Sequence, residues 1–313
     1  MMSNFDYYPV FLKKLNTISR LHLNNIKGIK GFLYKYYSLR QYMNYMPMNE
    51  KTQKSIEADD NDYIVSLTTY GSRTKTVHIT LDSIFRQTLR PSKVVLWLSR
   101  QEYPNKINDL PDQLRERYKN IDSFDIKFCD DLKPHKKYYE CMLQNPTKII
   151  ITCDDDVFYP ANWLLELNKL HKKFPDCICC TNAHKITFNN NREIDLYSNW
   201  IHLTEECGPS LLLCPVGVGG VLYPPNTLDK RLFDKVFIQA NCLNADDLWL
   251  KSMSILNNTK VVKCNKYPYT FLNIPSSSKN ALSKTNVLQK RNDEQLLNIL
   301  KVYRREIMRV LFQ

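Results

Sequence analysis

Three consecutive aspartates, Asp154, Asp155 and Asp156, directly follow an apolar run that extends from residue 148 to residue 153. The run has the composition of a buried strand, and a helix-like stretch comes after it. Carboxylates this close repel one another and push their pKa values apart unless a cation lies among them. Mg²⁺ and Mn²⁺ prefer oxygen ligands and commonly carry diphosphates. The pattern predicts a metal–diphosphate site; the alternative is a solvated acidic turn that caps the next helix.

A second acidic pair, Asp246 and Asp247, stands at the start of another predicted helix. One carboxylate cluster for a metal and a separate carboxylate base together suit sugar transfer from a nucleotide sugar. The metal would offset the charge that grows on the leaving diphosphate. The separate carboxylate would take the proton from the acceptor hydroxyl as attack begins.

Alternating strand and helix patterns position these residues. Such alternation predicts a mostly parallel sheet with helices on both faces, and in such sheets ligands bind beyond the carboxyl ends of the strands. The aspartate run and the segment Thr69–Arg73 both follow predicted strands. We expect strands at 63–69, 94–98, 124–128, 149–152 and 177–181, a hairpin at 211–223, and helices that begin near Pro160 and cover 293–312.

Composition limits the possible partners. The chain has 313 residues and a net charge of +12, from 44 Lys and Arg against 32 Asp and Glu, which favours an anionic partner. No apolar run reaches the length of a membrane span, and Lys13 and Lys14 interrupt the first apolar residues, so no signal peptide is predicted. We therefore expect a cytoplasmic protein. The ten cysteines lack a zinc-site spacing and are predicted to be small buried hydrophobes.

The first 60 residues differ from the rest of the chain. Seven Lys and Arg and no acid lie between Asp6 and Glu50, interleaved with apolar residues at helical spacing. These basic amphipathic helices either pack on the main body or hold the protein on the inner face of an anionic membrane. We predict three parts: a basic helical segment with a linker at 1–60, the main domain at 61–275, and a basic helix at 276–313.

Four segments resemble bacterial glycosyltransferases of the GT-A fold related to family 2, which build surface polysaccharides such as capsule and lipopolysaccharide. They are residues 64–70 (IVSLTTY), 152–157 (TCDDDV), 219–225 (GGVLYPP) and 245–249 (ADDLW), and the resemblance extends over about 62–275. It implies a Rossmann-like mixed sheet flanked by helices, with helical extensions at both ends. It also implies hexosyl or related sugar transfer, with inversion, from a nucleotide sugar, most often UDP-linked, to a saccharide or lipid-linked saccharide.

The resemblance assigns the metal, Mn²⁺ or Mg²⁺, and the diphosphate to Asp154 and Asp156. It assigns the base to the pair Asp246 and Asp247, with Asp247 favoured, although family 2 more often has Glu at the first position of this pair. Either Asp154 or Asp155 faces the ribose. Further candidate ligands of the nucleotide sugar are Thr69, Tyr70, Arg73, Asp130, Lys137, Gly219 and Gly220.

Three other functions compete with this interpretation. A nucleotidyltransferase would share the sheet and the metal, but it would need a glycine-rich basic loop after the first strand, where Gly71 is the single glycine. A nucleic-acid-binding protein would suit the charge, yet no helix-turn-helix, zinc-finger or RNP signature is present. A carbohydrate-binding module would not need both acidic clusters. We therefore expect a glycosyltransferase without a nucleic-acid partner.

Overall fold

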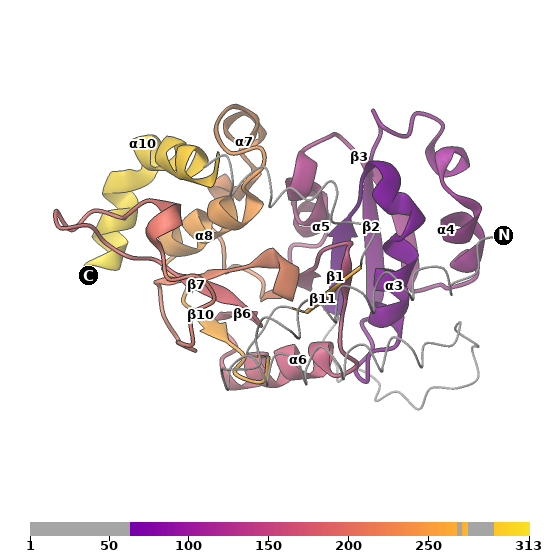
Figure 1. The fold of residues 1–313 in the computed structure, drawn as a ribbon, viewed down its shortest axis with the longest axis horizontal. Coiled ribbons are helices and arrows are strands. Elements are labelled where there is room, and N and C mark those ends of the chain that lie inside the picture. Colours follow the sequence, from indigo (N-terminus) through magenta and orange to yellow (C-terminus); the bar gives the residue numbers. More distant parts are fainter. Residues whose placement is uncertain (1–62, 268–270, 275–290) are drawn as a thin grey trace, which may run out of the picture.

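A seven-stranded mixed sheet forms the centre of the computed structural model, which describes residues 63–267, 271–274 and 291–313 (Figure 1). The predicted basic helices and linker within 1–60 lie outside the described residues. The strands of the central sheet are β1 (Tyr63–Thr68), β2 (Lys93–Ser99), β3 (Phe124–Cys129), β4 (Ile149–Thr152), β6 (Ile178–Cys180), β9 (Val221–Tyr223) and β10 (Val261–Lys263).

The strand order is β10-β6-β9-β4-β1-β2-β3. β1 pairs in parallel with β2 and β4, β2 with β3, and β10 with β6, whereas β9 runs antiparallel to β4 and β6. The parallel strands therefore end at one edge, where their connecting loops gather. The predicted fold class, a mixed α/β sheet flanked by helices, is confirmed.

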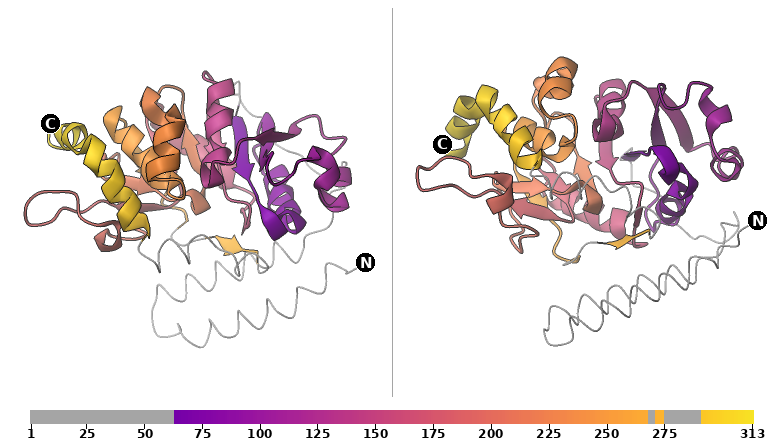
Figure 2. Two further views of the ribbon diagram at one scale, coloured as in Figure 1. Left: turned by 90° about the horizontal axis from the view of Figure 1, so that it is seen from above. Right: turned by 45° about the horizontal axis from the view of Figure 1, so that its top comes forward.

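Helices cover both faces of this sheet (Figure 2). Successive strand residues point to opposite faces, so Val65 packs into one hydrophobic cluster and Ile64 into the other. The Val65 face is covered by α3 (Val77–Phe85), α4 (Asp112–Arg117) and α6 (Trp163–Lys173). The Ile64 face is covered by α5 (Tyr139–Gln144), α7 (Lys235–Asn241), α8 (Asp246–Leu256) and α10 (Arg291–Leu311).

Short 3-10 helices occupy several of the connections. They are η1 (Gly71–Lys75), η2 (Lys106–Asp109), η3 (Lys133–Lys137), η4 (Tyr197–Asn199), η5 (Gly217–Gly219) and η6 (Lys230–Phe233). Two small two-stranded sheets accompany the main one: β7 (Ala183–Lys185) with β8 (Leu213–Pro215), and β5 (Val157–Phe158) with β11 (Leu272–Asn273).

The predicted hairpin at 211–223 is wrong. β8 pairs with β7 in a small sheet, whereas β9 enters the central sheet between β4 and β6. The glycine-rich turn between them redirects the chain: Gly220 has a φ of +85° and lies directly against the Trp163 ring. A local pattern of two apolar runs around glycines cannot tell a hairpin from two strands of different sheets.

The last helix is the one predicted at 293–312, and it packs on the main body. Leu296, Leu300, Tyr303 and Ile307 are buried in the same cluster as α8. Two side chains of α10 also hold neighbouring loops. Asp293 Oδ1 accepts the Ser198 backbone N–H at 2.9 Å, and Gln295 Oε1 accepts the Asn244 backbone N–H at 2.9 Å. The division of the chain into three parts stays a prediction.

Two predictions concern the thiols and the membrane. All ten cysteines are free and eight of them are buried, as expected for small hydrophobes. Among the described helices, none combines the length and the apolar character needed to cross a bilayer.

Candidate active site

Lys137 joins the two acidic clusters that the sequence places far apart. Its Nζ lies 3.0 Å from Asp154 Oδ1, after β4, and 2.8 Å from Asp246 Oδ2, at the start of α8. The side chain is only 6% exposed. Burial alone would lower the pKa of Lys137, but Asp154, Asp246 and Asp247 raise it well above its ordinary value. A permanent positive charge therefore holds the end of η3, the aspartate run and α8 together.

Arg73 neutralises the other two members of the aspartate run. Its Nη1 lies 2.6 Å from Asp155 Oδ1, and its Nη2 lies 2.9 Å from Asp156 Oδ2. The Thr69 hydroxyl donates a short hydrogen bond to the second oxygen of Asp155. Burial and the charges of Asp156 and Asp154 raise the pKa of Asp155 to about 7, although Arg73 and Thr69 lower it. The guanidinium also lies over the Tyr70 ring, 5.2 Å from its centroid, so Thr69, Tyr70 and Arg73 form one connected group.

The ion pairs of Lys137 and Arg73 change how the three crowded aspartates are interpreted. The crowding of Asp154, Asp155 and Asp156 predicted a cation among them, and the chain supplies two of its own, Lys137 and Arg73. Carboxylate oxygens remain suitable ligands for Mg²⁺ or Mn²⁺. Within the described part of the chain, no three His, Cys, Asp or Glu side chains converge as a complete metal site. An ion bound here would need water and diphosphate oxygens to complete its coordination, which is common for Mg²⁺.

The two aspartates at the start of α8 have different environments. Lys137 lowers the pKa of Asp246 against the effect of burial, so Asp246 is a fixed anion. Burial and the neighbouring Asp246 charge raise the pKa of Asp247 to about 7. Asp247 Oδ2 accepts the Gly217 backbone N–H at 3.0 Å, and its side chain is only partly buried. Asp247 therefore suits proton transfer near neutral pH, whereas Asp246 suits a structural ion pair.

Gly217 forms one wall of the site. From the sequence it counted only as a member of the glycine-rich turn at 217–220, whose backbone could approach a sugar. A Cβ at this position would lie 2.8 Å from Lys137 Nζ and 2.9 Å from Asp247 Oδ1. Gly219 and Gly220 are in contact with other side chains instead: the Gly219 carbonyl accepts from Trp163 Nε1 at 2.9 Å and from Thr181 Oγ1 at 2.7 Å. Ligand binding by Gly219 and Gly220 stays a prediction. The only local signal for Gly217 was its place in the same glycine-rich turn.

Replacing Gly217 and Gly220 with alanine should have different effects on stability. Gly217→Ala should lower the free energy of unfolding less than Gly220→Ala does, because the clashing atoms are the ends of side chains, but it should displace Lys137 and Asp247 and lower activity. Gly220→Ala should destabilise the fold by about 2 kcal/mol or more, since its Cβ would lie 2.3 Å from the Trp163 ring at a φ of +85°. Urea denaturation of both variants measures this, and a Gly217→Ala that unfolds while Gly220→Ala stays stable would contradict it.

Tyr159 ties the aspartate run to η5. Its hydroxyl accepts the Asp154 backbone N–H at 3.0 Å and donates to the Val218 carbonyl at 3.1 Å. The ring is buried against Trp163, 4.3 Å between centroids. This bridge fixes the wall that contains Gly217 relative to Asp154. No sequence motif pointed to Tyr159, because its role depends on a partner 59 positions later in the chain.

Asp130 lies apart from this group. It follows β3 as expected, but its carboxylate pairs with Arg100 at 3.1 Å and with Lys235. Its side chain is 48% exposed, and the Lys235 hydrogen bond lowers its pKa. Contact with a nucleotide stays a prediction for Asp130.

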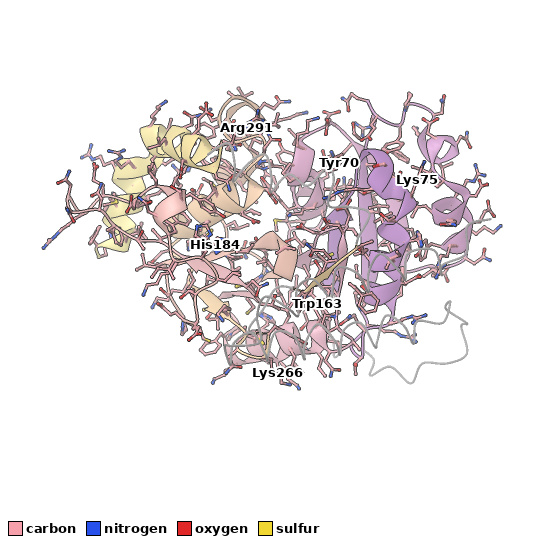
Figure 3. All side chains as sticks on the ribbon, viewed as in Figure 1. Tyr70, Lys75, Trp163, His184, Lys266 and Arg291 are labelled. Atoms are coloured by element: carbon pink, nitrogen blue, oxygen red, sulfur yellow. The ribbon has the colours of Figure 1, made fainter. Side chains whose placement is uncertain are left out.

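Figure 3 shows Tyr70 in the half of the molecule that contains α3 and His184 in the half that contains α8.

No family model matches the sequence, and no curated protein matches it. Among solved structures, residues 1–349 of TarS from S. aureus give a TM-score of 0.45 at 14% identity and cover 77% of this chain and 71% of theirs.

Two further structures are of similar closeness. The mannosyltransferase PcManGT from Pyrobaculum calidifontis, in complex with GDP-Man and Mn²⁺, gives 0.46 at 12% identity and covers 95% of this chain and 80% of its own. A 4-diphosphocytidyl-2C-methyl-D-erythritol synthase from Anaerococcus prevotii gives 0.43 at 15% identity and covers 74% and 100%. These likenesses are too weak to support a functional argument, which depends on the site itself.

Proposed function

We propose that this protein is a glycosyltransferase that moves a sugar from a nucleotide sugar to an acceptor hydroxyl. The observation that supports it best is the pair of contacts from Lys137 to Asp154 and Asp246. They bring a carboxylate run suited to a metal and diphosphate next to Asp247, whose pKa of about 7 suits a base. Sugar transfer needs both parts side by side, because departure of the diphosphate and deprotonation of the acceptor belong to one step.

The exposure of the three aspartate side chains indicates which of them can bind the donor. Asp154 is 32% exposed at its side chain and Asp156 14%, whereas Asp155 is 4% exposed and engaged with Arg73 and Thr69. We assign Mg²⁺ or Mn²⁺ to Asp154 and Asp156, where it would stabilise the charge on the leaving diphosphate. Asp155 then acts as the anchor of Arg73, and Asp154 is the better placed of the two to meet the ribose. Lys137 and Arg73 add fixed positive charge beside the diphosphate.

The finer assignments follow the resemblance noted in the sequence. We propose membership of the GT-A enzymes related to family 2, a UDP-linked hexose or related donor, and a saccharide or lipid-linked saccharide acceptor of a surface polysaccharide. A single carboxylate base, Asp247, supports direct displacement and inversion.

Binding of UDP tests the donor site without an acceptor. We expect calorimetry to detect UDP binding that Mn²⁺ strengthens, and Asp154→Ala and Asp156→Ala to lose that metal-dependent gain while both variants stay folded. Asp125→Ala is the matched control, since it removes a β3 aspartate that pairs with Lys93 at 2.7 Å and is not a candidate ligand. UDP binding with an unchanged Mn²⁺ response in Asp154→Ala and Asp156→Ala, or an equal loss in Asp125→Ala, would contradict the assignment.

We also propose that the protein works in the cytoplasm on the inner membrane surface, held there by its first 60 residues. The support is their seven basic residues without an acid between Asp6 and Glu50. Each such residue near an anionic surface contributes about 1 kcal/mol, and salt weakens the attraction. We expect the full chain to pellet with anionic vesicles at low salt and a chain that starts at Asp59 not to pellet. Equal behaviour of the two chains would reject the membrane role.

A further inference from the structure

We propose that Tyr197, His202 and His184, together called the ring cluster, form a subsite for a saccharide unit of the acceptor. The inference rests on the proposed transferase function and adds the place where the acceptor docks. Three observations support it: the cluster is connected through β7, β8 and Gly217 to Asp247, part of the cluster is exposed, and the strained turn that presents it is held by hydrogen bonds.

The three rings contact one another. The centroids of His184 and His202 lie 4.4 Å apart, and Tyr197 lies 5.7 Å from His184 and 5.2 Å from His202, nearly edge-on to both. Trp200 supports Tyr197 from the buried side at 5.2 Å. His184 is buried, Tyr197 is half-buried and His202 is exposed. The cluster therefore presents aromatic surface at His202 and at part of Tyr197, which suits the apolar C–H faces of a sugar.

The ring cluster belongs to the same part of the molecule as the candidate base. His184 stands opposite Cys214 in the pairing of β7 with β8, and the chain that leaves β8 reaches Gly217, whose N–H binds Asp247. The electrostatics agree: burial raises the pKa of Tyr197, and the charge of Asp247 raises it further. A saccharide on these rings would thus bring its hydroxyls toward Asp247.

The turn that presents the rings is strained and held in place. Leu203 has a φ of +48°, which is rare for a leucine, and its N–H donates to His184 Nδ1 at 2.9 Å. His184 is therefore a neutral acceptor, and burial lowers its pKa to about 4. Ile201 exchanges two backbone hydrogen bonds with Lys185, at 2.8 and 3.0 Å. Such restraint costs free energy, and it keeps a surface ready for a ligand.

Apolar side chains border the cluster. Ile201 is 50% exposed and Leu203 45% exposed, and both flank His202 in the turn. These aliphatic side chains extend the apolar surface around His202. The connection of the cluster to Asp247 through β8 and Gly217 favours the acceptor over the nucleotide, whose candidate ligands Thr69, Tyr70 and Arg73 follow β1.

A defined glycan array tests the proposal, probed with the full-length protein in the presence of UDP and Mn²⁺. We expect the wild type to bind one group of saccharides, and Tyr197→Ala and His202→Ala to weaken that binding by about tenfold each, the scale of one lost ring contact. UDP affinity should stay close to that of the wild type in both variants. His202→Ala, which removes the exposed ring, should also keep the wild-type melting temperature, whereas Tyr197→Ala should lower it because Tyr197 packs on the core. Phe188→Ala is the matched control, since it removes a ring of the same loop region that contacts Phe312 instead.

The outcomes separate this proposal from the proposed function. No saccharide bound by the wild type, or binding that survives in Tyr197→Ala and His202→Ala, would overturn the ring cluster as the acceptor subsite. A parallel loss of UDP affinity in these variants would also overturn it, because the rings would then serve the donor. Failure of the wild type to bind UDP would instead count against the transferase function, and it would leave the saccharide result to be judged by itself.

Discussion

Lys137→Met is expected to abolish sugar transfer and to lower the free energy of unfolding by about 3–5 kcal/mol, the usual cost of removing one partner from a buried ion pair. The methionine keeps most of the volume but leaves Asp154, Asp246 and Asp247 without the charge that compensates them. Urea denaturation measures the stability, and transfer or donor hydrolysis with Mn²⁺ measures the activity.

Lys136→Met is the matched control for this change. Lys136 is the preceding residue, is 3% exposed and pairs with Asp131 at 2.6 Å, away from the acidic clusters. Its loss should reduce stability by a comparable amount and leave the site's chemistry intact. A Lys137→Met variant that is as active as Lys136→Met would show that Lys137 serves only to stabilise the fold.

Asp247→Asn is expected to lower turnover by about a hundredfold or more, the scale of losing a general base. UDP affinity should change little, because the base acts on the acceptor. Asp246→Asn is the comparison: it removes a partner of Lys137 and should reduce stability as well as activity. If Asp247→Asn were active and Asp246→Asn inactive, Asp246 would be the base and Asp247 would not. If both variants were active, the two aspartates would serve only to cap α8.

The pKa of Asp247 also predicts a pH profile. The groups that face it are Asp246 on the same helix, Lys137 on η3, Asp154 after β4, and the Gly217 N–H. With a pKa of about 7, Asp247 is mostly protonated below pH 7, so turnover should rise about tenfold per pH unit up to neutrality and then level off. The remaining activity of Asp247→Asn should lack this rise. A wild-type profile that is flat from pH 5 to 8 would contradict the assignment.

Stability should depend on the same proton with the opposite trend. The folded-state pKa of about 7 is higher than the value of about 3.9 expected in the unfolded chain, so between these values the folded state binds more protons. The contribution of Asp247 to the free energy of unfolding therefore falls as pH rises from about 4 to about 7. Asp247→Asn should remove this contribution, and denaturation across that pH range would measure it.

The strands were predictable because each is a short apolar run that ends in polar or turn residues, and burial on both faces of a parallel sheet demands such runs. The confirmed positions of β1, β2, β3 and β4 differ from the predicted ones by one residue at most. The role of 211–223 was not predictable, since β9 finds its partners through contacts that are distant in sequence.

The site was predictable as a set of residues but not as an arrangement. Asp154 and Asp246 were singled out separately, yet nothing in the sequence showed that one lysine lies between them. The cation expected among the aspartates proved to include side chains of the chain itself, because a tertiary ion pair leaves no local pattern. For the same reason Tyr159 was missed, and Gly217 was visible only as a member of a glycine-rich turn. Nucleotide contact by Asp130, which pairs with Arg100 and Lys235, stays a prediction.

The two hydrogen bonds that α10 side chains accept have a consequence for folding during synthesis. Asp293 holds η4, next to the ring cluster, and Gln295 holds the loop that leads into Asp246 and Asp247. Every other described element precedes α10 in the chain, so its predecessors leave the ribosome first. A growing chain therefore carries the complete aspartate run while η4 and the loop before Asp246 are still unbraced, and we expect both segments to reach their final positions only when α10 docks.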